Sequence, residues 1–405
     1  MRVRVLWGVA WLGLVLGGCD QAPAAPPSDP RAADEVVVGV AVSLTGTFAP
    51  EGLEVRRGYE LWAAHANARG GLVVGARRQP VKLVIHDDES DPTTAARLVE
   101  HLIVHDKARF LLGPYGSVQT KAAALVAEQF DTVMVQGNGS AENLFERRFK
   151  NVFAVLTSAG HYTESTLTAL AARGARTIAV AYEDSSAHAD IARGAERFAP
   201  SLGMRVVAVE AYPRGVADVR DLMARMQSLD PDVLVACGYF NESLLFVRAA
   251  RGLGFSPRAM VLTVGPSNPD FLAQLGGDAE GLIGPAQWHR AMAHRDPVFG
   301  SAQDYHDRFS ASFGCAPSYQ AAAATAAGLA LELAIGRAGS LEIGAVRQAL
   351  RTLEAETFFG PIGFDEAGRN IKKSMGTTQV RGGELVLVDD GGSALTYPKP
   401  PWITR

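Results

Sequence analysis

Two serines, Ser117 and Ser140, stand at positions that are suited to holding an anion. They end the segments Gly113–Ser117 and Gln136–Ser140, each of which follows a short apolar run and precedes an expected helix. The first turn of a helix has unpaired amide N–H groups, and a serine hydroxyl beside them adds another donor. Both segments can therefore point donors at a carboxylate. The competing interpretation is that they are ordinary turns in which the serine only caps a helix.

The chain offers no familiar catalytic constellation. It has no GxSxG nucleophile motif, no HExxH helix and no GxxxxGK[ST] phosphate loop, so the common local signatures of hydrolases, zinc proteases and P-loop enzymes are absent. Residues 137–139, Gly-Asn-Gly, match only half of a dinucleotide-binding fingerprint. We therefore expect neither an enzyme nor a bound cofactor.

Patterns that bind metals are equally sparse. His101 and His105 lie one helical turn apart, but no third ligand is near them in the sequence, which favours a solvated helix face. The acidic run at residues 86–91 lacks the alternating ligands and the glycine of an EF-hand loop, and it is typical of a strand exit followed by a helix cap. No metal site is predicted.

The bulk composition limits the possible classes of protein. The 405 residues, of which 47% are hydrophobic and 20% charged, can form a large core and favour two domains. With 39 basic and 43 acidic residues the formal net charge is -4, and no long basic block is present, which makes nucleic acid an unexpected partner. Cys237 and Cys315 are expected to be buried thiols, and whether they pair is left open.

The N-terminus has the pattern of an export signal. Arg2 and Arg4 precede the apolar run Val5–Leu16, which is too short for a membrane-spanning helix of about 20 residues and favours a signal peptide over residues 1–18. Residues 16–19, Leu-Gly-Gly-Cys, resemble the bacterial lipobox, which implies that Cys19 becomes lipidated and anchors the protein to a membrane.

A tether follows this expected anchor. Residues 19–35 contain four prolines among Ala, Ser and Asp, a composition that favours extended backbone and cannot bury a core.

Beyond the tether, short apolar runs alternate with longer amphipathic segments, the pattern of parallel α/β sheets. Strands are expected at Val36–Val42, Val81–Ile85, Phe110–Leu112, Val133–Val135, Ile178–Tyr182, Val206–Val209, Val233–Ala236, Met260–Thr263, Gly360–Phe364 and Leu385–Val388. Helices are expected at Arg56–Ala68, Pro92–Asp106, Val118–Gln129, Ala187–Leu202, Val219–Ser228, Ser243–Leu253, Val298–Phe313 and Tyr319–Ala338. Two sheets are implied. Asp91 is expected to cap a helix that starts at Pro92, and Gly70-Gly71 is expected to end the helix before it.

A series of short motifs along the chain resembles the leucine/isoleucine/valine-binding protein family, whose members are periplasmic receptors of ABC transporters. The motifs are residues 38–46, 67–71, 86–88, 91–92, 112–117, 238–239, 279–282, 359–362 and 364–365. Each motif alone is weak, but their common order covers nearly all of the chain after Asp34. The resemblance implies a type I periplasmic binding fold with two doubly wound α/β lobes joined by a three-strand hinge. Residues 36–156 and 285–356 are expected to form lobe one, and residues 157–284 and 357–405 lobe two.

The resemblance also implies where a ligand lies. In open parallel sheets the binding crevice lies beyond the carboxyl ends of the strands. In the family, the residues that match five positions of this chain contact the carboxylate end of the ligand. These positions are Tyr115, Gly116, Ser117, Gly139 and Ser140.

Lobe two departs from the family pattern. Members that bind amino acids commonly place a glutamate where this chain has Ser267. Because a buried ammonium group without a counter-charge is costly, either another acid substitutes or the ligand is not an ordinary α-amino acid. The acids considered as substitutes are Glu51, Glu183 and Asp184. The first loop of lobe two has Ala187-His188 in place of the Tyr-Gly pair of the family.

Aromatic residues offer flat walls for an apolar part of the ligand. Tyr239 follows an apolar strand and is expected to line the site, while packing in the core or hinge competes with a binding role for Tyr239, Phe240 and Trp288. The resemblance thus implies a monomeric, lipid-anchored receptor on the periplasmic side of the inner membrane, or on the outer face of a cell membrane. It would deliver an amino acid, amide or small carboxylate to ABC permease subunits. A ligand-sensing subunit and an exported enzyme remain as alternatives.

Overall fold

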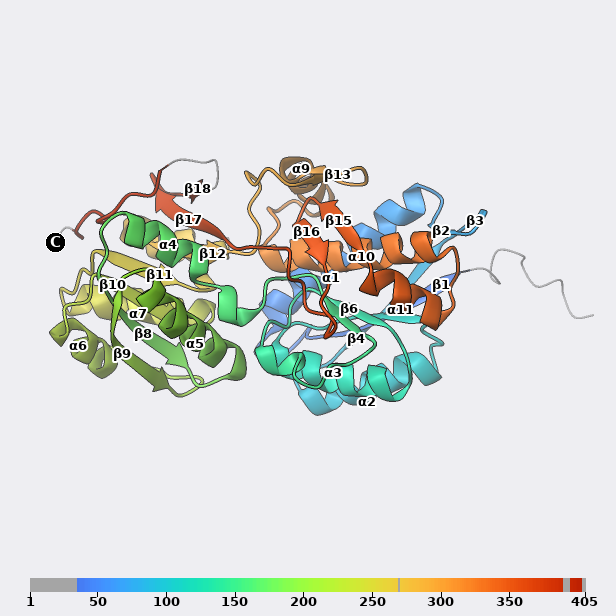
Figure 1. The fold of residues 1–405 in the computed structure, drawn as a ribbon, viewed down its shortest axis with the longest axis horizontal. Helices are drawn as coiled ribbons and strands as arrows, with labels where there is room; N and C mark the ends of the chain where they lie inside the picture. The colour runs from blue at the N-terminus through green and yellow to red at the C-terminus, as the bar shows by residue number, and fades with distance from the viewer. Residues whose placement is uncertain (1–34, 269, 389–393, 403–405) are drawn as a thin grey trace, which may run out of the picture. The chain divides into compact units, whose positions relative to one another are not determined.

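A computed structural model of the chain describes residues 35–268, 270–388 and 394–402. The expected signal peptide, Cys19 and nearly all of the tether lie outside the described residues. Two larger sheets organise the rest of the chain (Figure 1).

The first sheet has five parallel strands. Its strands, in spatial order, are β4 (Val81–Asp87), β1 (Val36–Val42), β5 (Phe110–Leu112), β6 (Met134–Gln136) and β7 (Val152–Ala154). The run Val-Val-Val-Gly-Val-Ala-Val of β1 is almost wholly buried, as a strand in the middle of a parallel sheet must be when helices cover both faces. Helices α1 (Ala49–Ala68) and α10 (Tyr319–Ala338) pack on one face, and α2 (Pro92–Val104) and α3 (Ser117–Gln129) pack on the other.

Local capping groups set the ends of these helices as the sequence predicts. The Asp91 carboxylate accepts a hydrogen bond from the Thr94 amide at 2.7 Å, and Pro92 occupies the first helical position of α2. At the end of α1 the backbone of Gly71 has a φ of 98°, and its amide bonds to Ala66 O at 2.9 Å.

The second sheet has seven strands, of which one, the second from an edge, runs antiparallel to the other six. Its spatial order is β18 (Glu384–Val388), β17 (Gly376–Arg381), β12 (Ile283–Ala286), β11 (Ala259–Leu262), β10 (Val233–Cys237), β8 (Thr177–Glu183) and β9 (Arg205–Tyr212). Its helices are α4 (Glu164–Ala172), α5 (Ser186–Ser201), α6 (Arg220–Ser228), α7 (Phe240–Gly252) and α8 (Asp270–Leu275). Two hydrophobic clusters, one on each face, hold these helices to the sheet. We call the first sheet with its helices the first lobe, and the second sheet with its helices the second lobe.

A long stretch after β12 packs on the first lobe. It contains β13 (Arg295–Asp296), β14 (Gly300–Ser301), α9 (Ala302–Phe313), α10, α11 (Ile343–Arg351), β15 (Glu354–Thr357) and β16 (Gly360–Gly363). Helix α9 begins at Ala302 rather than at the expected Val298, because Ser301 and Asp304 form a reciprocal capping box there.

Helix α10 has the length and composition of a membrane-spanning helix, the one such case among the described residues. Most of it is buried in the protein, where its small residues let α1 approach closely. Gly328 faces the ring of Trp62, which is fully buried, so a side chain at position 328 would collide with the indole. The position of α10 in the core therefore explains its apolar composition.

Three chain segments connect the lobes, and one residue of each lies at a shared crossing. The Thr157 amide donates to Gln287 Oε1 at 3.1 Å, and Gln287 Nε2 donates back to Thr157 O at 2.9 Å. The Thr157 hydroxyl donates to Lys373 O at 3.1 Å. These bonds tie the three connecting segments together at a single place.

The third crossing lies at Lys373, later in the chain than the expected boundary between residues 356 and 357. Phe358 stacks on Tyr305 of α9 with ring centroids 4.0 Å apart, and Phe359 and Ile362 are buried in the same cluster of the first lobe. Because this aromatic packing holds residues 357–363 on the first lobe, we propose to place the third lobe boundary near Lys373.

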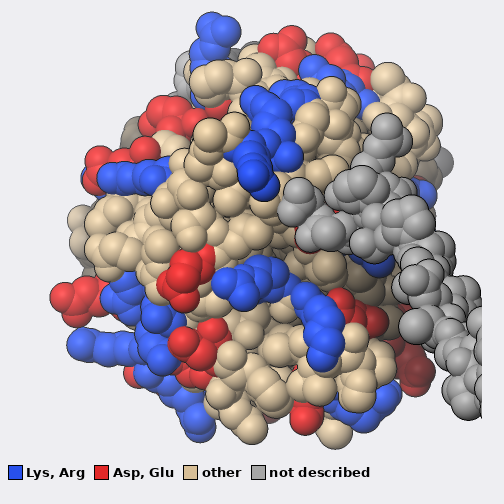
Figure 2. All heavy atoms as spheres, turned by 90° about the vertical axis from the view of Figure 1, so that its right-hand side faces the viewer, with Lys and Arg blue, Asp and Glu red and all other residues tan. Residues whose placement is uncertain are grey.

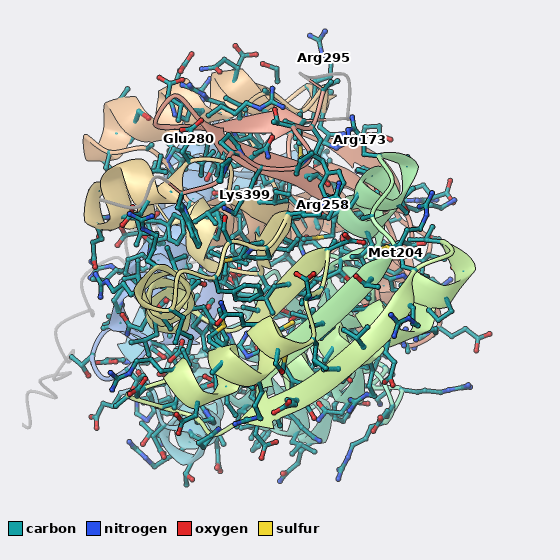
Figure 3. The ribbon with its side chains drawn as sticks, turned by 90° about the vertical axis from the view of Figure 1, so that its left-hand side faces the viewer. Arg173, Met204, Arg258, Glu280, Arg295 and Lys399 are labelled. Atoms are coloured by element: carbon teal, nitrogen blue, oxygen red, sulfur yellow. The ribbon has the colours of Figure 1, made fainter. Side chains whose placement is uncertain are left out.

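The C-terminal segment lies against the second lobe. The Lys399 amide bonds to Arg258 O at 2.8 Å, and both residues can be seen in Figure 3. Lys399 Nζ lies 3.9 Å from the centre of the Trp402 ring, and burial lowers the pKa of this amine to about 8. Figure 2 shows a different face, on which lysine and arginine side chains lie among aspartate and glutamate side chains.

Candidate functional site

A cavity of about 30 Å³ lies between the carboxyl ends of the parallel strands of the two sheets. The first lobe contributes Tyr115, Gly116, Ser117, Asn138, Ser140 and Tyr319, and the second lobe contributes Tyr162, Ala187, His188, Ile191, Tyr239 and Val264. Loops of both lobes thus meet at one place, as expected for parallel sheets whose strands end there. A volume of this size holds a water molecule but no larger solute.

Ser117 joins two loops of the first lobe. Its Oγ accepts hydrogen bonds from the amides of Ser140 and Ala141, both at 3.1 Å. Because a hydroxyl has one hydrogen to donate besides its two acceptor lone pairs, the Ser117 O–H remains a donor for a ligand. Gly116 precedes Ser117 with a φ of 87°, a conformation that favours glycine. A glycine at this position therefore lets α3 start at Ser117.

The loop after β6 is shaped by the side chain of Gln136. Gln136 Oε1 accepts from the amides of Asn138 at 2.9 Å and Gly139 at 2.7 Å. Asn138 Nδ2 donates to Gln320 O at 3.3 Å, whereas Asn138 Oδ1 is buried and has no hydrogen-bond partner. An orphaned acceptor of this kind is costly unless a donor reaches it.

Two expectations for this loop need correction. Gly139 does not line the cavity; it packs against Thr120, whose Oγ1 would lie only 2.6 Å from a Cβ at position 139. Ser140 is followed by the three-residue 3-10 helix η1 (Glu142–Leu144) and not by an α-helix. The helix-dipole argument for an anion therefore applies at Ser117 but not at Ser140.

Four tyrosines surround the cavity, and their hydroxyl groups lie close to one another. Burial is the largest cause that raises the pKa of Tyr115, Tyr162, Tyr239 and Tyr319. The nearby side chains of Gln287, Ser140 and Tyr319 oppose this rise in the pKa of Tyr162. The four phenols therefore stay neutral and supply both donors and acceptors to the cavity.

On the second lobe, Ala187 and His188 occupy the start of α5. The His188 ring meets the edge of Tyr239 with centroids 4.5 Å apart, and its Nδ1 lies 3.0 Å from Ser185 Oγ. Glu183 Oε1 lies 3.6 Å from both His188 Nδ1 and Arg214 Nε. Glu183 Oε1 is nevertheless buried without a hydrogen-bond partner, so Glu183 stays one of the acids that can replace the missing glutamate.

Glu51 lies in the first turn of α1, and Glu242 lies in the first turn of α7 on the opposite lobe. Both are buried, neither lines the cavity itself, and neither forms an ion pair with a described basic side chain. Burial raises the pKa of Glu51, and the nearby charge of Glu242 raises it further. A cationic group placed between these carboxyl groups would relieve both effects.

Direct contacts across the two lobes hold this arrangement together. Phe48 of the first lobe packs edge-on against Tyr239 of the second, with ring centroids 5.6 Å apart. Away from the cavity, the Glu142 amide donates to Asp190 Oδ2 at 2.8 Å. The lobes are therefore closed on one another, which agrees with the small volume of the cavity.

Ser267 lies apart from the other expected site residues. It ends the 3-10 helix η3 (Gly265–Ser267), and its hydroxyl donates to Val264 O at 2.8 Å. It lines a second hollow of about 310 Å³, together with Trp288 and Tyr319. Cys237 and Cys315 are free thiols, the first buried and the second exposed.

A family model described as "Periplasmic binding protein" matches residues 35–384 of the chain. This range includes every residue that lines the cavity and every strand of both sheets except β18, of which only the first residue is matched. The chain belongs to this family. It is a periplasmic solute-binding protein with the type I periplasmic binding fold, and it is not an enzyme.

Curated relatives of this periplasmic binding protein are similar over most of their length. "Leu/Ile/Val-binding protein homolog 7" of Brucella abortus is 25% identical over 398 residues, which is 94% of this chain and 96% of the relative. The "leucine-, isoleucine-, valine-, threonine-, and alanine-binding protein" of Pseudomonas aeruginosa is 26% identical and covers 83% of this chain and 87% of its own.

Solved structures show the same fold. The leucine-binding protein LivK of Thermotoga maritima has a TM-score of 0.75 at 25% identity, covering 87% of this chain and 97% of its own. A solute-binding protein of an ABC transporter from Rhodopseudomonas palustris, in complex with 3,4-dihydroxybenzoic acid, has a TM-score of 0.76 at 20% identity. It covers 91% of this chain and 99% of its own. Both solved structures thus share the fold of this periplasmic binding protein.

Several residues in or near the cavity of this periplasmic binding protein are not singled out by the sequence. Asn138 lies inside a loop that the sequence does single out, and Glu242 follows Gly238-Tyr239 at the start of a helix, so a search of all polar residues after strand ends would have found both. Tyr162 and Tyr319 follow no strand directly. Their position depends on how the two lobes meet, which no local pattern reports.

Proposed function

We propose that this periplasmic binding protein captures a small solute that carries a carboxylate and an amino or amide group, and delivers it to the permease of an ABC transporter. The observation that supports this most directly is the cavity, in which hydroxyl groups of both lobes face one another at the carboxyl ends of two parallel sheets. Closure of lobes around a solute is the usual action of such proteins.

The polar groups of the site match the two ends of such a solute. The Ser117 hydroxyl and the first amides of α3 are donors that suit a carboxylate. Asn138 Oδ1 is a buried acceptor, and Glu51 and Glu242 are buried acids without a basic partner among the described residues. These acceptors suit an ammonium or amide N–H group and replace the glutamate that Ser267 does not supply. An amino acid or an amide is therefore the favoured solute.

A small aromatic carboxylate is the second candidate. Four tyrosines line the cavity, and aromatic rings form favourable walls for a flat solute. One relative of the same fold holds 3,4-dihydroxybenzoic acid. An aromatic acid has no ammonium group, so it would leave Glu51 and Glu242 without a counter-charge.

The anchor is also a proposal. The sequence Leu-Gly-Gly-Cys at residues 16–19 supports lipidation of Cys19 after cleavage of residues 1–18. We expect Cys19→Ala to abolish the lipid and release the protein from the membrane fraction, as measured by mass spectrometry of the N-terminus. Wild-type protein with an intact Met1 and no acyl chain would contradict the proposal.

The solute can be identified from the protein as it is isolated. Mass spectrometry of the compound that co-purifies with gently isolated protein should find an amino acid or amide in unchanged chemical form. A thermal-shift screen of amino acids, amides, benzoates and aliphatic carboxylates then ranks the classes. Stabilisation by benzoates alone would favour the second candidate, and stabilisation by none of the four classes would reject the proposed solutes.

The role of the acids separates the two candidates. Glu51→Gln should weaken the binding of an α-amino acid, measured by calorimetry, by at least about tenfold, because hydrogen bonds to charged groups contribute about 1.5–3 kcal/mol. The same variant should leave the affinity for a benzoate unchanged. Glu54→Gln is the matched control on the same helix, since Glu54 already has a basic partner, Arg57, at 2.6 Å.

A further inference from the structure

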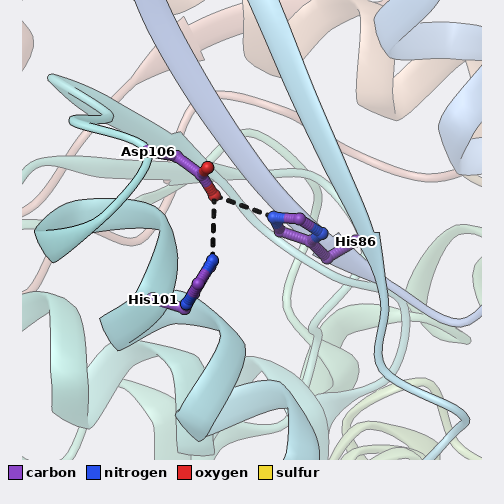
Figure 4. Close-up of side chains that lie close together, drawn as sticks. All are labelled: His86, His101 and Asp106. Carbon is purple, nitrogen blue, oxygen red and sulfur yellow. Dashed lines mark hydrogen bonds and ion pairs between the residues drawn. The ribbon is translucent and has the colours of Figure 1, made fainter.

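Two histidines and an aspartate come together on the first lobe, away from the solute cavity. His86 Nε2 lies 2.8 Å from Asp106 Oδ2, and His101 Nε2 lies 3.8 Å from the same oxygen (Figure 4). The three ligand atoms all lie within 4.8 Å of one another. None of the three residues lines the cavity between the lobes.

Separate elements position these side chains. His86 lies near the carboxyl end of β4, His101 lies in the last turn of α2, and Asp106 follows that helix. His105, which caps α2, stacks on His101 with ring centroids 4.7 Å apart and an interplanar angle of 30°. Asp106 directly follows the pair His101 and His105 in the sequence, whereas His86 is brought in by the packing of α2 beside β4.

The geometry points to a transition-metal site made of His86, His101 and Asp106. Two ligands of a tetrahedral zinc ion, each about 2.0–2.1 Å from the metal, lie about 3.3 Å apart. The two distances to Asp106 Oδ2, 2.8 and 3.8 Å, lie on either side of this spacing. Small rotations of partly exposed side chains therefore suffice to seat the ion.

The donor set selects the class of metal. Two imidazole nitrogens and one carboxylate oxygen suit Zn²⁺ or Cu²⁺, whereas Ca²⁺ and Mg²⁺ prefer sites built only from oxygen. Three protein ligands leave one tetrahedral position for water or for a group from outside the chain. The bound ion would fasten β4 to the end of α2, so metal binding should also stabilise the first lobe.

Calorimetry of the untagged protein with zinc chloride tests the site. Wild-type protein should bind Zn²⁺ at one site, and His101→Asn or His86→Asn should weaken this binding by at least about tenfold. His161→Asn is the matched control: its side chain is 46% exposed and pairs with Glu164 at 3.1 Å, much as His101, 47% exposed, lies beside Asp106.

A spectroscopic measurement gives an independent test. Cobalt(II) at the site should produce the intense visible absorption of four-coordinate geometry in the wild type and in His161→Asn, but not in His101→Asn. Circular dichroism of each variant verifies the fold. Absence of zinc binding at millimolar metal, or undiminished binding in the double variant His86→Asn, His101→Asn, would overturn the proposal.

Discussion

Ser117 has two functions at the scale of a single residue. Its oxygen accepts the amides of Ser140 and Ala141, so it shapes the loop, and its O–H group remains free to donate. A structural role and a binding role therefore reside in one hydroxyl group. Measurements of affinity alone cannot separate these roles.

Ser117→Ala should lower both affinity and stability. We expect a loss of about 1–3 kcal/mol in binding, the range for a hydrogen bond to a charged group, and a similar loss in the free energy of unfolding because two buried amides lose their acceptor. Calorimetry and denaturant unfolding measure the two effects. Ser201→Ala on α5 is a control, since the exposed Ser201 hydroxyl only donates to Phe198 O. Unchanged stability of Ser117→Ala would show that the loop does not depend on this bond.

The carboxyl group of Glu51 should make stability depend on pH. Burial raises its pKa in the folded protein above the ordinary value of 4.5, so the folded state resists deprotonation. The wild type should therefore lose stability relative to Glu51→Gln as pH rises from about 4.5 through the folded pKa. Below that interval the carboxyl group is protonated in both states, so this loss of stability should be absent. Urea unfolding of both proteins between pH 4 and 8 measures it. A difference that does not change with pH would contradict the assignment.

At the scale of elements, helix α10 contains two glycines in opposite environments. A Cβ at Gly328 would meet the indole of Trp62, whereas a Cβ at Gly336 would meet no other atom within 4 Å. The same helix thus provides its own control for the packing of α1 on α10.

Gly328→Ala should destabilise the protein by about 1–3 kcal/mol, because an added methyl group forces the buried Trp62 ring to move. Gly336→Ala should instead stabilise it by about 0.5–1 kcal/mol through helix propensity. Thermal unfolding of the two variants tests the pair of expectations. Equal effects would show that α1 and α10 do not pack as closely as described.

The sequence predicts the elements well and their meeting points poorly. Buried strands such as β1 and capped helix starts such as Pro92 follow from local patterns, and they agree with the structure to within a few residues. The cavity combines Tyr115 with Tyr162 and Tyr319, which lie far apart in the chain. Their contact depends on how the two lobes pack, and no periodic pattern in the sequence reports that packing. The same reason hides the third lobe boundary, which we propose to place near Lys373 because of the aromatic packing of Phe358.

At the scale of the whole molecule, the lobes must separate before a solute enters, because the cavity of about 30 Å³ is too small to admit one. The bonds among Thr157, Gln287 and Lys373 place the pivot of this movement. Opening therefore rotates the lobes about the three connecting segments without unfolding either sheet.

Solute binding should reduce the radius of gyration and stabilise the protein. Small-angle scattering with and without saturating solute measures the closure, and at solute a hundredfold above Kd the stabilisation should reach about 2.7 kcal/mol. A compound of similar size that does not bind serves as the control. An unchanged scattering profile at saturation would count against a closing movement.

The contacts of Phe48 with Tyr239 and of Glu142 with Asp190 join the lobes without involving a solute. They stabilise the closed arrangement of the lobes, so a minority of molecules without solute should also adopt it. Under the proposed function, such molecules would bind the permease without solute and cause ATP hydrolysis without transport. Asp190→Ala should lower the rate of ATP hydrolysis without transport. It should also weaken the apparent affinity for the solute. The same contacts would then cause both the ATP hydrolysis without transport and the high affinity for the solute.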